Sequence, residues 1–193
     1  MMRSLGTDEG EGERKSMGVY SREEIERAFQ HYWQTGAVNE DWEGFANGFA
    51  PDVLYVEHVL GTMKGREQIR GWIIPIMEEY CELYTAYEWH TIDEEGGRAI
   101  VYMQNRRDHP SGTGTIDFPG VTILQYAGDG LWGLEEDYWA VPAANATVKE
   151  YAAACEQHDP DHKQKRTRNH WGSGPAWTRG APSWFERPGA KNR

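Results

Sequence analysis

Hydrophobic residues in the first part of the chain recur with the spacing of amphipathic helices. The first set lies at i, i+3, i+4, i+7 and i+8 and comprises Ile25, Ala28, Phe29, Tyr32 and Trp33. This set predicts a helix that begins at the capping box Ser21-Arg-Glu-Glu24 and ends at Gly36. The next set has the same spacing and comprises Trp42, Phe45, Ala46, Phe49 and Ala50. It predicts a second helix, capped by Asn39 and ended by Pro51-Asp52. A third helix is predicted over about residues 66–80, with a kink at Pro75.

Strand-like segments follow, and turn residues separate them. A short strand is predicted at 53–58, followed by a Gly61–Gly65 turn that carries a second short strand. Longer strands are predicted at 83–92, 98–108, 115–127 and 131–140. Helices first and antiparallel strands afterwards indicate an α+β fold, with three N-terminal helices packed on a curved, mostly antiparallel sheet.

Charge is distributed unevenly along the 193 residues, whose net charge is −11. Residues 1–157 carry 12 basic and 28 acidic side chains, whereas residues 158–193 carry 8 basic and 3 acidic ones. The acidic body argues against nucleic-acid binding by that body, because phosphates would be repelled. No apolar run reaches the roughly 18 residues of a membrane span, so no membrane insertion is expected.

Composition divides the chain into three parts. Residues 1–19 are rich in Gly and Glu and are predicted to be disordered, and residues 20–142 form the folded domain. Residues 143–193 form a C-terminal extension, in which Asn145 caps a short helix before a basic tail rich in Trp, Pro and Gly. We expect this tail to fold back on the acidic body or to cross to a dimer partner; contact with nucleic acid or an anionic membrane surface is the alternative. Two cysteines and no signal peptide indicate free thiols in a reducing, cytoplasmic location.

Polar residues on three predicted strands are candidates for chemistry. Side chains alternate between the faces of a strand, so Tyr55 shares a face with Glu57 while His58 lies on the other. By the same rule, one face of the 98–108 strand carries Tyr102, Gln104, Arg106 and Asp108. One face of the last strand carries Glu135, Asp137 and Trp139. A buried charged residue such as Asp137 needs a partner.

Three motifs and the order of elements resemble the nuclear transport factor 2-like superfamily, most closely its SnoaL-like, polyketide cyclase-like branch. The motifs are Phe49-Ala-Pro-Asp52, Tyr55-Val-Glu-His58 and Gly61-Thr-Met-Lys-Gly-Arg-Glu-Gln-Ile69, within a resemblance that covers about residues 20–141. The resemblance implies a conical half-barrel that encloses a pocket and commonly pairs as a homodimer. The superfamily includes cyclases, isomerases, dehydratases, an epoxide hydrolase and non-catalytic members, so the fold alone does not select a function.

A residue pattern similar to that of limonene epoxide hydrolase implies more specific roles. Tyr55, Arg106-x-Asp108 and Asp137-Tyr138 match its pattern, while Glu57 stands where that enzyme has an asparagine. A register shifted by one residue would instead present Asn105 and Arg107. A resemblance to ketosteroid isomerase would put His58 at the position of the base.

The favoured interpretation is a SnoaL-like enzyme that performs acid–base chemistry on a small hydrophobic molecule without a cofactor or metal: cyclisation, isomerisation, dehydration or epoxide hydrolysis. Asp137 is the expected base and Asp108 the acid, with Arg106 setting their charges and Tyr55 and His58 in support. The expected ligand-binding residues are Tyr32, Trp33, Glu57, Trp72, Trp89, Tyr102 and Gln104. The alternative is a small-molecule-binding or dimeric assembly module of the same fold without catalysis.

Overall fold

Helices and a six-stranded sheet form the part of the chain that the computed structural model describes, residues 19–165. The helices are α1 (Arg22–Trp33), the π-helical turn η1 (Gln34–Val38), α2 (Trp42–Asn47), α3 (Arg66–Glu79), α4 (Val141–His158) and α5 (His162–Lys165). The strands are β1 (Phe49–Glu57), β2 (Gly61–Lys64), β3 (Tyr84–Asp93), β4 (Arg98–Asp108), β5 (Thr115–Gly128) and β6 (Leu131–Trp139). The α+β class and the order of elements are therefore as the sequence predicts.

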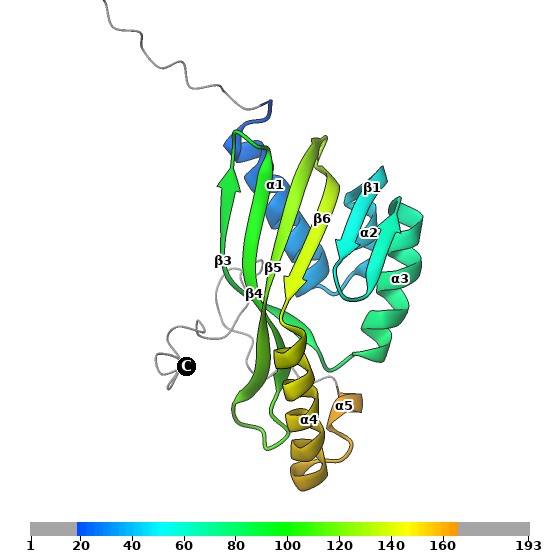
Figure 1. Cartoon of the computed structure of the whole chain (residues 1–193), viewed down its shortest axis with the longest axis vertical. Coiled ribbons are helices and arrows are strands. Elements are labelled where there is room, and N and C mark those ends of the chain that lie inside the picture. Colours follow the sequence, from blue (N-terminus) through cyan, green and yellow to red (C-terminus); the bar gives the residue numbers. More distant parts are fainter. Residues whose placement is uncertain (1–18, 166–193) are drawn as a thin grey trace, which may run out of the picture.

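The sheet has the strand order β2-β1-β6-β5-β4-β3. All neighbouring strands are antiparallel except β1 and β6, which run parallel. The sheet curves, and α1 lies across its concave face while α3 flanks β1 and β2 (Figure 1). Helix α4 follows β6 and packs against the lower half of β5 (Figure 1). The result is an unclosed cone of sheet and helices, the architecture that the resemblance implies.

The main core lies between α1 and the sheet. Ile25, Phe29 and Trp33 project from α1, and Leu124 and Trp132 meet them from the sheet; none of the five is more than 2% exposed. Burial of large apolar side chains at about 25 cal/mol per Å² is the main force that holds α1 on the sheet. Ser21 caps α1 by accepting a hydrogen bond from the Glu24 amide at 3.2 Å, as the capping box predicts.

Three predicted boundaries were wrong. The helical path does not end at Gly36, since it tightens into η1 and continues to Val38. The cap of α2 is Asp41 rather than Asn39, and α2 ends at Asn47 because Phe49 already pairs with Trp132 in the sheet. Helix α4 begins at Val141, four residues before the predicted cap. At α2, the hydrogen bond that Asp41 accepts and the sheet pairing of Phe49 outweigh the helical spacing.

Two glycines provide a matched test of this packing. A Cβ at Gly36 would lie 2.6 Å from Phe45 Cδ2, whereas a Cβ at Gly71 on α3 would meet nothing within 4 Å. Phe45 is held by aromatic neighbours, so Gly36→Ala is expected to lower the free energy of unfolding by about 1–3 kcal/mol. Gly71→Ala is expected to raise it by about 0.5–1 kcal/mol through helix propensity. Urea unfolding of both variants measures the two free energies of unfolding. Equal changes in the two variants would contradict the close contact between Gly36 and Phe45.

Candidate active site

A cavity of about 350 Å³ lies between the concave face of the sheet and helices α2, α3 and α4. Most of its wall is aromatic or aliphatic, as a ligand pocket for a hydrophobic molecule requires. Exposed apolar side chains at its edge, Leu60, Tyr80 and Val148, mark where it opens to solvent. Polar residues occur at a few positions of the wall only.

The acid end of the cavity, as we name it, consists of Asp137 and Glu135 on β6 with their hydroxyl partners. Asp137 accepts hydrogen bonds from the Tyr55 hydroxyl at 2.6 Å and from the Thr122 hydroxyl. The Tyr32 hydroxyl donates to Glu135 Oε1 at 2.8 Å. Both carboxyl groups point from the same strand face toward the cavity, two residues or about 7 Å apart along β6.

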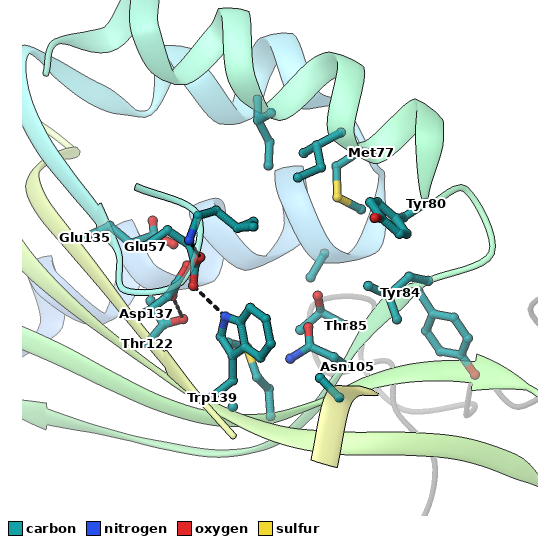
Figure 2. Close-up of a pocket in the computed structure, with 18 of the residues that line it drawn as sticks. Glu57, Met77, Tyr80, Tyr84, Thr85, Asn105, Thr122, Glu135, Asp137 and Trp139 are labelled. Atoms are coloured by element: carbon teal, nitrogen blue, oxygen red, sulfur yellow. Dashed lines mark hydrogen bonds between the residues drawn. The ribbon is translucent and has the colours of Figure 1, made fainter. Parts of the chain in front are cut away.

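The strand pairing explains why these side chains meet. Parallel pairing of β1 with β6 sets Tyr55 beside Glu135 and Glu57 beside Asp137. Antiparallel pairing of β5 with β6 sets Thr122 opposite Asp137. The neighbouring strands β1, β6 and β5 therefore direct these polar side chains toward the same end of the cavity (Figure 2).

Burial shapes the protonation of the acid end. Burial raises the pKa of Asp137 to about 6. The hydrogen bonds from Thr122 and Tyr55 favour the charged form and offset part of this rise. Burial also raises the pKa of Glu135 well above its ordinary value, and the charge of Asp137 raises it further. Asp137, with a pKa of about 6, is therefore mostly a carboxylate at neutral pH, while the raised pKa of Glu135 favours its protonated form. This is a base next to an acid.

One atom of this pair is left without a partner. Glu135 is 2% exposed, and its Oε2 has no hydrogen-bond partner among the residues that the structure describes. Because Oε1 already accepts from Tyr32, the proton of neutral Glu135 belongs on Oε2. When protonated, Glu135 thus carries a donor at the cavity wall, beside the Tyr55 hydroxyl.

Glu57 lines the cavity as well, but its oxygens are occupied. Oε1 accepts from the Trp139 indole, as Figure 2 shows, and Oε2 accepts from the amides of Val59 at 3.2 Å and Leu60 at 2.6 Å. It therefore holds the turn between β1 and β2 against β6.

The structure brings half of the predicted site residues to the cavity. Those that line it are Tyr32, Trp33, Tyr55, Glu57, Trp72 and Asp137. Those that lie elsewhere are His58, Trp89, Tyr102, Gln104, Arg106 and Asp108. Arg106 and Asp108, which match the Arg-x-Asp motif of limonene epoxide hydrolase, therefore do not face the cavity.

The register of β4 accounts for most of the second group. Val101 pairs with Thr122, so odd-numbered residues of β4 face the cavity and even-numbered ones face away. On the far face Arg106 forms an ion pair with Asp117 at 2.9 Å. Asp108 accepts from Tyr84 on the same face at 2.7 Å. The shifted register is the one that lines the cavity, with Asn105 and Arg107.

The remaining two residues, His58 and Trp89, also lie on the outer face of the sheet, Trp89 because the register of β3 shifts between Tyr87 and Trp89. His58 lies past the end of β1 and contacts Glu136 Oε1 at 2.8 Å, on the outside of the sheet. Trp89 stacks on Tyr102 with ring centroids 5.6 Å apart, and Trp89 is 45% exposed. Both residues therefore have partners on the outer face of the sheet.

Glu135 and Thr122 complete the acid end; from the sequence, Glu135 is a candidate on the last strand with no role assigned to it, and Thr122 is not among the candidates. Glu135 shares the alternation face of Asp137, which is visible in the sequence. Thr122 follows from the Asp129-Gly130 turn, because the pair Gly128–Leu131 at that turn implies Thr122 opposite Asp137 when counted outward. In residues 19–165, no group of three or more His, Cys, Asp or Glu side chains is arranged to hold a metal ion. No helix in that range is both long and apolar enough to cross a membrane.

Fold and cavity together define an α+β cone of the nuclear transport factor 2-like type. The model of the SnoaL-like domain family matches residues 25–133, and the chain belongs to this family. No curated protein matches the sequence.

Solved structures share the fold at low sequence identity. An LEH-like epoxide hydrolase from M. tuberculosis is 15% identical with a TM-score of 0.56, over 70% of this chain and 96% of that one. TerC, crystallised with polyporic acid, is 19% identical with a TM-score of 0.53, over 65% and 98% of the two chains. An NTF2-like protein of unknown function from Burkholderia pseudomallei K96243 is 16% identical with a TM-score of 0.52, over 65% and 95%.

The buried charge of Asp137 has a measurable effect on stability. Its folded pKa of about 6 exceeds the ordinary 3.8, so the folded state binds this proton more tightly and stability falls as the pH rises from about 4 to 6. Asp137→Asn removes the titrating group and with it this loss of stability at higher pH. Its free energy of unfolding, relative to wild type, is expected to increase by about 2 kcal/mol between pH 4 and pH 7.5. Denaturant unfolding at both pH values measures this difference, and a pH-independent difference would show that Asp137 is not buried as a charge.

Proposed function

We propose that the protein is an enzyme that isomerises or cyclises a small hydrophobic carbonyl compound by acid–base catalysis. The observation that carries this proposal is that two buried carboxyl groups, Asp137 and Glu135, lie on one face of an aromatic cavity, with the pKa of Asp137 raised to about 6 and that of Glu135 raised well above its ordinary value. A base with a pKa near the working pH and a neighbouring acid is what proton transfer at carbon needs.

The roles follow from the contacts. The Asp137 carboxylate, oriented by Tyr55 and Thr122, takes a proton from the carbon next to the substrate carbonyl. The Oε2 hydroxyl of Glu135 donates to the carbonyl oxygen, on which negative charge develops. Asp137 then returns the proton to another carbon, which isomerises the substrate, or the enol attacks a second carbonyl and closes a ring. Burial raises the pKa of Tyr32 and of Tyr55 well above the usual value, so both tyrosines remain donors throughout.

This proposal assigns the acid to Glu135 rather than to Asp108. Asp108 and Arg106 lie on the far face of β4 with partners of their own. Dehydration and epoxide hydrolysis remain the alternatives within the same chemistry, because both also need one base and one acid. We further propose that the protein works as a cytoplasmic homodimer; the family resemblance supports the dimer, and two cysteines that form no disulfide, Cys81 and Cys155, support the location.

The largely apolar wall favours a second candidate, a small-molecule-binding module without catalysis. Such a module would bind hydrophobic ligands equally well with or without the Asp137 carboxylate.

Hydrogen–deuterium exchange of a ketone tests the proposal without knowledge of the natural substrate. The probes are 2-tetralone and a set of bicyclic and tricyclic ketones in D2O, followed by NMR. Wild type is expected to accelerate exchange at the carbon beside the carbonyl, with a rate that rises with pH to a plateau above about pH 6. Asp137→Asn is expected to lose about 100-fold or more, and Glu135→Gln about 10–100-fold.

Glu136→Gln is the matched control, since Glu136 lies between the two acids on the opposite face of β6 and contacts His58. It should exchange at the wild-type rate. If wild type exchanges no faster than buffer for every ketone that binds, the binding-module function is favoured instead.

A further inference from the structure

The cavity continues well beyond the acid end. Asn105 and Arg107 on β4 line it, and so do Asn145 and Val148 on α4. Figure 2 shows Trp139 between Asp137 and Asn105, so the two polar regions lie on either side of the indole. Helix α4 follows the segment that matches the SnoaL-like domain, which ends at residue 133. This region of the cavity is therefore built partly by the chain's own extension.

The sheet register gives the distance between the two regions. Thr122, which contacts Asp137, lies four residues from Phe118, the partner of Asn105, and six from Ile116, the partner of Arg107. At about 3.3 Å per residue, these separations are about 13 Å and about 20 Å along β5. A ligand that touches both ends must be elongated.

Arg107 has an unused donor at this second region. The side chain is 3% exposed, and its Nε donates to Glu82 Oε1 at 3.0 Å. Its guanidinium lies over the Tyr151 ring of α4, 5.4 Å from the ring centroid. Its Nη1 has no hydrogen-bond partner within residues 19–165. A buried donor without an acceptor is costly, and a ligand oxygen there would relieve that cost.

The charges of the two ends differ in sign. Glu82 is shared by Arg107 and by Lys163, whose Nζ lies 3.8 Å from Oε2, so two cations face one carboxylate. The neighbouring Asp108 is on the other face of β4, bonded to Tyr84. At the acid end, Asp137 and Glu57 face the cavity with no Arg or Lys paired to either among the residues described. A ligand carboxylate is therefore repelled at one end and attracted at the other.

We propose that Arg107 and Asn105 bind a carboxylate at the far end of an elongated hydrophobic substrate. Arg107 supplies a charge-assisted hydrogen bond from Nη1, and the Asn105 amide supplies a second donor. The carboxylate sets the direction of the substrate and leaves its other end at Asp137. This inference rests on the proposed function for the identity of the reacting end, whereas the carboxylate site itself does not depend on catalysis.

Calorimetric titration with a matched pair of probes tests the site: biphenyl-4-carboxylate and its neutral analogue biphenyl-4-carboxamide. Wild type is expected to bind the carboxylate at least ten-fold more tightly than the amide. Arg107→Gln is expected to abolish this preference, and Asn105→Leu to reduce it several-fold. Arg106→Gln is the matched control, because the neighbouring arginine is equally buried but faces away from the cavity, and it should keep the preference.

Two further variants keep the test decisive. Arg107→Gln leaves Glu82 without its closest cation, so Arg107→Gln with Glu82→Gln replaces the ion pair by an amide pair if the single variant does not fold. Asp137→Asn should lose catalysis but keep the preference for the carboxylate, which separates failure of this site from failure of the proposed reaction. Equal binding of the two probes by wild type would overturn the proposal, as would loss of the preference in Arg106→Gln alone.

Discussion

The parallel pairing of β1 with β6 is the constraint on which the acid end of the cavity depends. It aligns Tyr55 with Glu135 and Glu57 with Asp137, so that one tyrosine hydroxyl lies between two carboxyl groups. Side chains alternate along each strand, and a shift of β1 by one residue against β6 would turn Tyr55 and Glu57 to the outer surface. Glu57 helps to prevent such a shift, because it ties the turn after β1 to Trp139 on β6. A residue that looks like part of the chemistry thus maintains the geometry that the chemistry needs.

The same pairing explains how two acids coexist without a buried cation beside them. Hydroxyl groups replace an arginine here: Tyr55 and Thr122 donate to Asp137, and Tyr32 donates to Glu135. Hydrogen bonds from neutral donors stabilise a carboxylate less than a full positive charge does. The pKa of Asp137 therefore remains raised to about 6 instead of falling below 3.8, and the pKa of Glu135 stays well above its ordinary value. An arginine at this position would have ionised both acids and removed the difference between them.

Much of the fold was predictable from the sequence, because local patterns determine it. The stripe of Ile25, Phe29 and Trp33 and the cap at Ser21 produce α1 as expected, and the β-strands lie within a few residues of their predicted bounds. The site was predictable only in part. Asp137 and Tyr55 meet because each follows the simple alternation of its own strand, whereas Arg106 and Arg107 are adjacent and equally polar. Which of them faces the cavity depends on the loop between β4 and β5, where Asp108 pairs with Thr115, and no local pattern determines that loop length. The long-range register of β4 against β5 therefore determines which arginine faces the cavity.

The two ends of the cavity also differ in where their parts come from. Of the acid end, the hydroxyl partners Tyr32, Tyr55 and Thr122 lie within the segment that matches the SnoaL-like domain, whereas Glu135 and Asp137 follow it on β6. The second region needs Glu82 before β3, Arg107 on β4 and Tyr151 on α4, three segments that come together only when the extension packs under the sheet. Apolar contacts of Ile116 with Tyr151 and Ala154 hold α4 there, and the buried guanidinium of Arg107 lies over the Tyr151 ring. Burying an arginine in this way is expensive unless its donors are used. The sheet therefore carries both the acid pair and Arg107, and the added helix α4 supplies the aromatic ring that covers the guanidinium.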